Sequence, residues 1–160
     1  MFLRRTLLAA ATVALVSACA SMSAPKTVAD TLAANPALST LHGLVVKAGL
    51  TPTLQGTGPF TVFAPTNEAF KAVPQKTMDA LAKDPAMLKN VLTYHVVPGK
   101  LASSDIKAGP MKTINGANVA LARAGDFVTV EDAMVQTANI AASNGVVHTV
   151  DRVMIPPAKK

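Results

Sequence analysis

The segment LTYHVVPGK, residues 92–100, marks a change from helical to extended chain. Upstream of it, Asp84-Pro85 is a typical helix start, and apolar residues then recur at helical spacing as far as Leu92. Residues 94–97 are mostly β-favouring, and the Pro98-Gly99 pair favours a turn. The sequence therefore predicts a helix that ends here and a short strand over residues 94–97.

His95, within this segment, has two interpretations. In a strand, Tyr94 and Val96 face one side while His95 and Val97 face the other, so one member of each pair is expected to be buried. A buried neutral imidazole needs hydrogen-bond partners for both ring nitrogens, and backbone groups can supply them. His95 is then a structural residue at the corner between helix and strand. The alternative is direct contact with a ligand, and the sequence leaves both open.

The chain before this corner carries helix signals around one strand. Asn35 and Pro36 fit an N-cap and a first helical position, and Gly49 fits the end of the helix that they begin. Thr66 is expected to cap a short helix directly after a buried strand at 60–64. The expected helices lie at 27–34, at 36–48, after 66, from 77 and from 85, with a loop at 51–59.

The chain after the corner changes character. Residues 111–155 give short β-favouring runs separated by turn signals, and the Asn-Gly pairs at 115–116 and 144–145 predict hairpins. The expected strands lie at 111–114, 118–122, 127–130, 135–140 and 146–155. Helices early and strands late predict an α+β fold rather than alternating β-α units.

The N-terminus has the features of a secretory signal peptide over residues 1–18: two arginines, an apolar run and small residues. The apolar run is too short for a stable transmembrane helix. Val16-Ser17-Ala18 before Cys19 resembles a bacterial lipobox, which predicts cleavage before Cys19 and its acylation. A lone cysteine in a secreted protein favours this reading. Cleavage after Ala20 is the alternative, and it gives a secreted soluble protein.

The predicted organisation is a signal peptide at 1–18, a tether at 19–26, one domain at 27–157 and a tail at 158–160. The predicted location is the cell envelope, lipid-anchored, which is the outer membrane or periplasm if the cell is Gram-negative. Loss of Arg4 and Arg5 lowers the formal net charge from +6 to +4. The lysines are scattered singly, without the clusters of basic and aromatic residues typical of nucleic-acid binding.

Residues suited to catalysis or metal binding are few. A hydrolase needs Ser or Cys near a histidine, and the sequence has no Gly-x-Ser-x-Gly motif. The three histidines are separated from one another by about fifty residues, and nine acidic residues are too sparse for calcium loops. We therefore expect a non-enzymatic protein without metal or cofactor.

Three segments, in this order, resemble the fasciclin domain family: TVFAPTNEAF at 61–70, YHVVPG at 94–99 and NGVVHTVDRVMIP at 144–156. The resemblance implies a β-sandwich wedge of two sheets with several helices packed along one side. It also implies an extracellular adhesion or surface-interaction module. The expected partner is a surface protein or polysaccharide, bound by a monomeric or weakly self-associating domain. The alternative is a carrier of small apolar ligands in a groove between wedge and helices.

In animal members, the family's Tyr-His region and an Asp-Ile pair before the third segment are linked to integrin-dependent adhesion. This chain matches the first element, but Asn139-Ile140 replaces the second, so the carboxylate for such a contact is missing. The candidate interaction surface comprises Tyr94, His95, Val96, Val97, Pro98, Asn139 and Ile140.

Four other polar residues are predicted to support the fold: Thr66, Asn67, His148 and Asp151. Asn67 is expected to satisfy local backbone groups at a helix start. Asp151, on the last strand, needs hydrogen-bond donors, because an unpaired buried carboxylate is costly. We expect it to bond backbone amides near the APTN turn, residues 64–67, and so to join the first and third segments.

Overall fold

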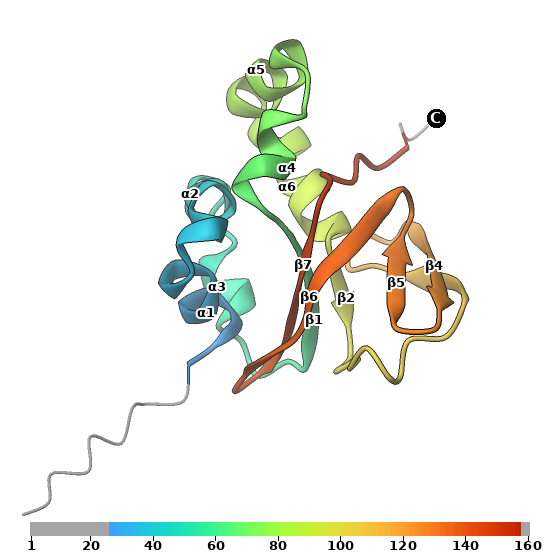
Figure 1. The fold of residues 1–160 in the computed structure, drawn as a ribbon. Helices are drawn as coiled ribbons and strands as arrows, with labels where there is room; N and C mark the ends of the chain where they lie inside the picture. The colour runs from blue at the N-terminus through green and yellow to red at the C-terminus, as the bar shows by residue number, and fades with distance from the viewer. Residues whose placement is uncertain (1–25, 158–160) are drawn as a thin grey trace, which may run out of the picture.

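The computed structural model describes residues 26–157 (Figure 1). These residues form six α-helices, one 3₁₀-helix and seven strands. In chain order they are α1 Val28–Ala34, η1 Pro36–Leu38, α2 Ser39–Lys47, α3 Thr51–Leu54, β1 Phe60–Pro65, α4 Asn67–Lys71, α5 Gln75–Lys83, α6 Pro85–Tyr94, β2 Val96–Pro98, β3 Gly109–Lys112, β4 Asn118–Ala124, β5 Phe127–Val130, β6 Ala133–Ala142 and β7 Gly145–Val150. None of these helices is long and apolar enough to cross a membrane. The predicted signal peptide, Cys19 and the tail at 158–160 lie outside the described residues.

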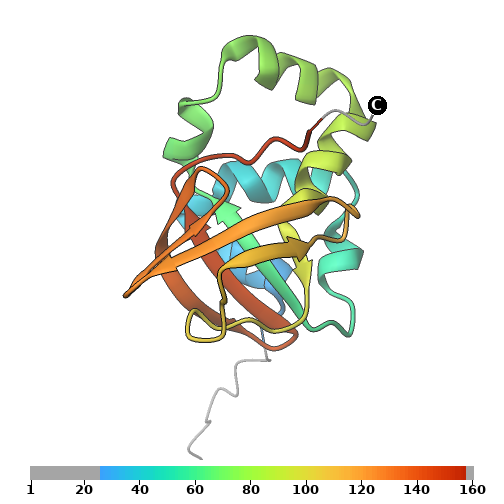
Figure 2. The ribbon, with the colours of Figure 1, turned by 90° about the vertical axis from the view of Figure 1, so that its right-hand side faces the viewer.

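The strands form a sheet of order β2-β1-β7-β6-β5-β4-β3, which curls on itself (Figure 2). β1 and β7 are parallel and the other pairs are antiparallel. β6 pairs with β5 near its start and with β7 along the rest, so it belongs to both halves of the sheet. The Ile114 amide donates to the Val96 carbonyl at 2.9 Å, which nearly closes the wedge. The predicted α+β wedge is confirmed, with its two sheets joined through β6.

Two apolar cores lie on opposite faces of the β1–β7 region. Helices α1, α2, α3 and α6 pack on one face, where Leu41 and Val147 are buried. The interior of the wedge forms the other core, with Phe63 and Val130 fully buried. Because β7 contributes to both cores, all six of its residues are buried. This explains the nearly continuous apolar run of the third segment.

The helix starts follow the capping signals of the sequence. The side chains of Thr27, Asn35, Thr66 and Asp84 each accept a hydrogen bond from a backbone amide in the helix that follows. These amides have no partner within the helix, so each cap stabilises its helix. Helix α2 ends at Lys47, and Gly49 just beyond it has a φ of 67°, a left-handed conformation that glycine adopts without steric strain.

Two helical predictions differ from the structure. A short helix, α3, occupies the first part of the predicted loop at 51–59, with Pro52 in its first turn, where a missing amide hydrogen costs nothing. α5 begins at Gln75, directly after Pro74, rather than at residue 77.

Two strand predictions are also corrected. α6 continues through Tyr94, so the strand expected at 94–97 begins only at Val96. β7 ends at Val150 instead of continuing to 155, because its partner β1 ends at Pro65. The Thr66 amide donates to the Val150 carbonyl at 3.1 Å as the chain turns into α4. Residues 151–157 then run as an irregular segment across one end of the wedge.

Candidate functional site

Tyr94 ends α6 with its side chain 3% exposed, packed among the apolar residues inside the wedge. Its hydroxyl has two acceptors within reach, the Asn118 carbonyl at 3.1 Å and the Glu131 carboxylate at 3.2 Å. Burial, together with the Glu131 charge, raises the pKa of Tyr94 to about 12. The phenol is therefore a neutral donor that ties α6 to β4 and to the β5–β6 turn.

His95 follows as the C-cap of α6 and is 2% exposed. Its Nδ1–H donates to the Val91 carbonyl at 2.8 Å, while Nε2 accepts the Met154 amide hydrogen at 3.0 Å. This tautomer requires a neutral ring, and burial lowers the pKa of His95 to about 4. Both nitrogens are occupied by backbone groups, as the structural interpretation of His95 requires. His95 thus holds the segment 151–157 against the helix-to-strand corner.

His148, in β7, has a similar arrangement of partners. Its Nε2–H donates to the Leu101 carbonyl at 2.8 Å, and Nδ1 accepts the Asn139 amide hydrogen at 3.2 Å. The ring stacks on Phe63 with centroids 5.6 Å apart. Burial lowers the pKa of His148. His148 therefore connects β7 to the loop at 99–108 and to the irregular stretch of β6.

The candidate surface at residues 94–98 is wrong for four of its five members. Tyr94, His95, Val96 and Val97 are buried, and only Pro98 is exposed. The physical reason is that the helix carries Tyr94 into the wedge, while β2 lies between the two apolar cores.

Asn139 and Ile140 complete the predicted surface. Ile140 is half-buried against the helix-side core. Asn139 is exposed and has a φ of 61°, but its side chain is engaged on both sides by Ser103. Its Oδ1 accepts the Ser103 amide hydrogen at 2.8 Å and its Nδ2 donates to Ser103 Oγ at 2.8 Å. Asn139 fixes the loop at 99–108 to β6, which is a structural task.

The predicted supporting residues have partners that sequence alone did not identify. Thr66 caps α4, as expected. The Asn67 side chain reaches α2 and η1, where Oδ1 accepts the Thr40 amide at 3.0 Å and Nδ2 donates to the Pro36 carbonyl at 2.9 Å. The Asp151 carboxylate accepts the Met134 amide at 2.7 Å, so its donor belongs to β6 and not to the APTN turn.

Asn144 is a supporting residue that sequence reasoning read only as a turn. Its Oδ1 accepts the Val28 amide at 2.8 Å, and its Nδ2 donates to the carbonyls of Leu54 and Gly56 at 2.7 and 2.8 Å. One side chain thus joins the start of α1, the end of α3 and the β6–β7 turn. The Asn-Gly pair was the available signal, but its distant partners could not be deduced from it.

Two open hollows flank the irregular segment 151–157, and we call them together the C-terminal groove. The first has a volume of about 590 Å³ and is lined by Tyr94, Asn118, Glu131, Asp132, Arg152 and Ile155, among others. The second, of about 600 Å³, is lined by Met87, Asn90, Asn115, Ala117, Ile155 and Pro156, among others. Ile155 is 50% exposed and borders both. The groove therefore offers an apolar centre with polar walls.

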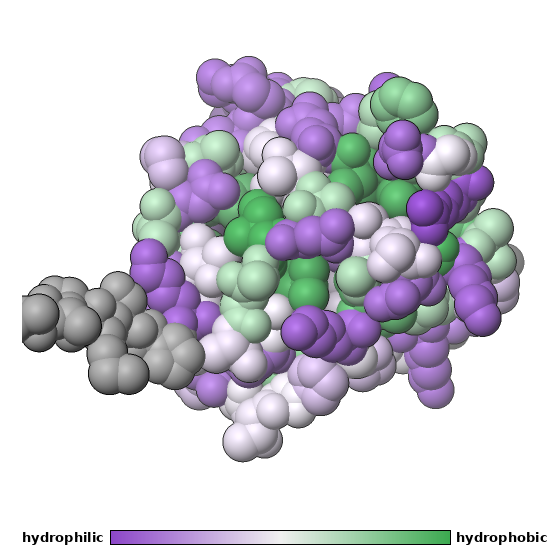
Figure 3. Space-filling model, turned by 60° about the horizontal axis from the view of Figure 1, so that its bottom comes forward, coloured by the Kyte–Doolittle hydropathy of each residue, from purple (hydrophilic) through white to green (hydrophobic). Residues whose placement is uncertain are grey.

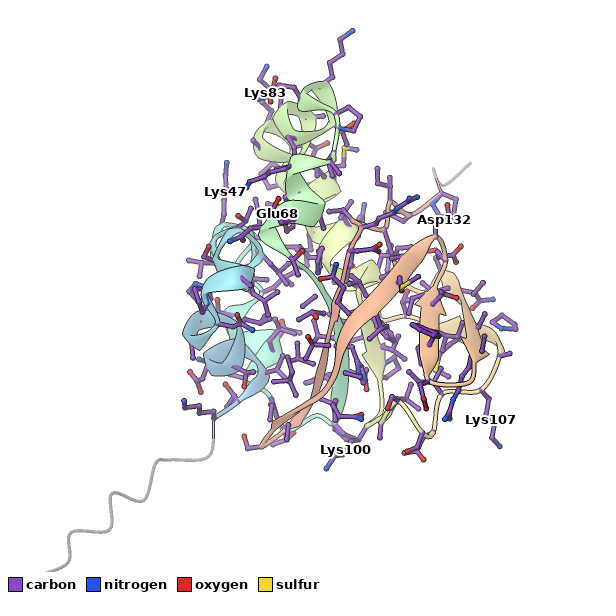
Figure 4. The ribbon with its side chains drawn as sticks, viewed as in Figure 1. Lys47, Glu68, Lys83, Lys100, Lys107 and Asp132 are labelled. Carbon is purple, nitrogen blue, oxygen red and sulfur yellow. The ribbon has the colours of Figure 1, made fainter. Side chains whose placement is uncertain are left out.

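The first hollow of the groove has charged residues at its edge. Glu131 has a φ of 55°, and its carboxylate accepts the Ala120 amide at 2.7 Å. Asp132 and Arg152 are exposed, and neither takes part in an ion pair among the described residues, where the only pair joins Lys71 to Glu68. Figure 4 shows Asp132 at this end of the molecule, far from Lys100 and Lys107. Charged partner groups can therefore approach Asp132 and Arg152 directly.

The apolar cavity between the helices and the sheet is small. An apolar cavity of about 20 Å³ lies between the helices and β1, lined by Leu41, Val45, Leu54 and Val62, among others. This volume holds about one water molecule. Across residues 26–157 no three His, Cys, Asp or Glu side chains lie close enough to hold a metal ion.

Comparison with known proteins decides the family. The family model of the fasciclin domain matches residues 36–156, which is most of the described chain. The chain belongs to the fasciclin domain family. The three segments identified in the sequence are explained by the fold. They supply β1 with the α4 start, the α6–β2 corner, and β7 with the groove segment.

Fasciclin relatives come from distant organisms. Protein sll1483 of a Synechocystis strain is 40% identical over 146 residues, covering 90% of this chain and 81% of that protein. The pig transforming growth factor-beta-induced protein ig-h3 is 42% identical over 135 residues, which is 84% of this chain but 20% of ig-h3. The cell surface glycolipoprotein MPB83 of Mycobacterium bovis is 38% identical over 137 residues, 82% of this chain and 61% of MPB83. This chain thus corresponds to one part of the last two proteins.

A solved structure supports the fold independently. The fasciclin domain pair of the insect cell adhesion molecule Fasciclin I superposes with a TM-score of 0.66 at 16% identity, covering 82% of this chain and 51% of that one. At this identity the likeness concerns the fold alone.

Proposed function

We propose that this fasciclin domain is a non-enzymatic adhesion or surface-interaction module of the cell envelope, anchored through an acylated Cys19. The observation that carries the binding role is the C-terminal groove, an open hollow beside an exposed apolar side chain and unpaired charges. The names of relatives support a surface location, since MPB83 is called a cell surface glycolipoprotein. The lipobox before Cys19 supports the anchor.

The groove fits an extended protein segment better than a sugar. Ile155 offers a contact for an apolar side chain, while Asp132 and Arg152 offer contacts for charged ones. Sugar binding commonly uses an exposed aromatic ring, and the aromatic residue lining the first hollow, Tyr94, is buried to its hydroxyl. We therefore place the partner's apolar residue on Ile155 and its charged residues along the rim.

The geometry around the histidines supports a non-enzymatic role. A general base needs a free nitrogen near the reacting atom, but both nitrogens of His95 and of His148 bind backbone groups. Freeing a nitrogen of either ring for a reaction would leave a buried backbone group without its hydrogen-bond partner, which costs stability.

The carrier alternative has little space in this domain. Ligand pockets usually have volumes of a few hundred Å³ or more and enclose most of the ligand. The enclosed apolar cavity has about 20 Å³, and the larger hollows are open. A carrier function predicts a higher melting temperature in a panel of lipids and small apolar molecules. We expect none of these compounds to raise it.

A capture experiment tests the groove. The mature protein is used to recover partners from envelope and host-surface extracts, and wild type is compared with Ile155→Asp and Asp132→Lys. Val46→Asp is the matched control, because Val46 is 53% exposed on α2, away from the groove. We expect the groove variants to lose a partner that the control retains, with all variants showing the wild-type circular dichroism spectrum. Equal recovery by all four proteins contradicts the proposal, and a partner released by glycosidase treatment identifies a glycan instead.

A further inference from the structure

The described chain starts at the end of the domain opposite the C-terminal groove. The Lys26 carbonyl accepts the Ser143 amide hydrogen at 2.8 Å, so the chain enters beside the β6–β7 turn, at the blue end of the ribbon in Figure 1. Lys100 and Lys107 lie at this same end, whereas Asp132 lies at the other (Figure 4). Any tether that precedes Lys26 therefore approaches the domain from the side away from the groove.

Phe127 is the most exposed large hydrophobic residue of the described chain, at 64%. It is the first residue of β5 and pairs with Ala124 at the turn of the β4–β5 hairpin. The next residue, Val128, is buried inside the wedge, so Phe127 lies on the outer face of the sheet. Phe127 belongs to neither apolar core, so packing inside the domain does not account for an aromatic residue at this position.

Arg123 fastens this hairpin to the loop that carries the lysines. Its Nη1 donates to the Ser104 carbonyl and its Nε to the Gly125 carbonyl, each at 2.9 Å. Arg123 is the register partner of the buried Val128, so its side chain lies on the face opposite Phe127 and holds the hairpin against this loop. Lys100 and Lys107 are exposed and form no ion pair with a described residue. We call Lys100, Lys107 and Phe127 the tether-side rim.

Carboxylates near the rim limit its positive charge. Asp105 lies in the loop at 99–108 and Asp126 in the hairpin turn. Rim charge alone would therefore bind an anionic surface weakly, since each cation near such a surface contributes only about 1 kcal/mol. Figure 3 shows this face, where hydrophobic patches lie between hydrophilic side chains. A surface that takes both an aromatic ring and cations suits the rim best.

The tether length limits where the rim can be. Lys26 is seven positions after Cys19, and an extended chain spans at most about 3.5 Å per residue, or about 25 Å in all. A lipid on Cys19 would hold Lys26 within that distance of the bilayer, and so keep the tether-side end of the domain near it at a high local concentration. Weak contacts are then enough to fix an orientation, because stable membrane association commonly combines an acyl chain with a second signal.

From these observations we infer that the tether-side rim rests on the bilayer, with Phe127 in the headgroup interface and Lys100 and Lys107 on anionic lipid phosphates. The C-terminal groove then faces away from the membrane, toward incoming partners. This inference rests on the proposed anchor at Cys19. The recognised chemistry is an anionic lipid surface, and no protein takes part in it.

The sequence has no tryptophan, which permits a direct test with single reporters. Phe127→Trp and Ile155→Trp proteins, acylated and extracted from membranes, are reconstituted into vesicles of phosphatidylcholine with phosphatidylglycerol, with or without brominated acyl chains. We expect the Phe127→Trp emission to shift to shorter wavelength and to be quenched by the brominated lipid. The Ile155→Trp emission should show neither change, because residue 155 lies at the far end.

Two further arms separate the possible causes. In the Phe127→Trp protein, the double substitution Lys100→Glu with Lys107→Glu should reduce the quenching. The charge-matched double substitution Lys76→Glu with Lys83→Glu, on α5 at the far end of the domain, should leave the quenching unchanged. Quenching at 155 instead of 127, or at neither position, overturns the inference. A shift at 127 that depends on protein concentration without lipid indicates self-association and also overturns it.

The anchor and the rim can fail separately. Intact mass of the extracted protein decides whether Cys19 is acylated. If it is not, unacylated protein is titrated with the same vesicles at high lipid concentration. Quenching at 127 under those conditions supports the rim without the anchor, and its absence overturns the rim.

Discussion

The hydrogen bonds of His95 predict an acid-sensitive stability. The folded protein holds the pKa of His95 at about 4, against an ordinary value of 6.5. Between these two pKa values the unfolded chain binds more protons than the folded protein. The contribution of neutral His95 to the free energy of unfolding is therefore complete above this pH range and is lost as the pH falls through it. At about 1.4 kcal/mol for each pKa unit, His95 accounts for roughly 3 kcal/mol over the whole window.

The test is urea denaturation followed by circular dichroism at pH 7 and pH 5. His95 alone should lower the free energy of unfolding by roughly 2 kcal/mol between these values, and His148 should add a loss in the same direction. In His95→Phe the His95 share of this pH dependence disappears. The variant should also be less stable at pH 7 by roughly 2–4 kcal/mol, because the Val91 carbonyl and the Met154 amide lose their partners.

His42→Ala is the control, because His42 is half-buried on α2, away from the corner. It should retain the wild-type pH dependence. Equal stability of the wild type at pH 7 and pH 5 would contradict a buried neutral His95, even if His95→Phe does not fold. An unchanged pH dependence in His95→Phe would assign the effect to other groups.

Three more predictions follow from single side chains. Gly145→Ala should destabilise the fold by about 1–3 kcal/mol in urea denaturation, because the added Cβ would overlap the Phe60 carbonyl oxygen. Gly43→Ala is the control, since Gly43 lies on α2 with open space around it, and this substitution should stabilise the fold by about 0.5–1 kcal/mol. Absorbance at 295 nm reports Tyr94 alone, the chain's single tyrosine, and should show no ionisation below about pH 11 while the protein stays folded; titration near pH 10 would contradict its burial. Asn144→Ala should lower the melting temperature and the free energy of unfolding by about 2–4 kcal/mol, because three backbone groups lose their partner, and a near-neutral effect would contradict that role.

The sequence predicted the local structure well, because local signals act through nearby atoms. The caps at Asn35, Thr66 and Asp84 each bond amides within three residues, so their partners are fixed by the chain itself. The α+β class followed from the order of helical and strand-like runs. The three family segments then identified the wedge.

The sequence could not predict which polar side chains face solvent. Tyr94 and His95 looked like candidates for a surface, but β2 begins two residues later than expected and α6 carries Tyr94 into the wedge. The partners of Asn144 and Asp151 depend on which strands pair, and no spacing in the chain encodes that. The C-terminal groove was missed for the same reason, since its walls come from α6, the β5–β6 turn and residues 151–157.

We propose that the C-terminal groove is the surface that meets partners. A photo-crosslinking amino acid placed at Ile155 in the full-length protein, expressed in its own cells, tests this proposal in the intact envelope. We expect a discrete crosslinked protein from position 155 that is absent when the same group replaces Val46 on α2. Crosslinks of equal yield from both positions, or from Val46 alone, would contradict it.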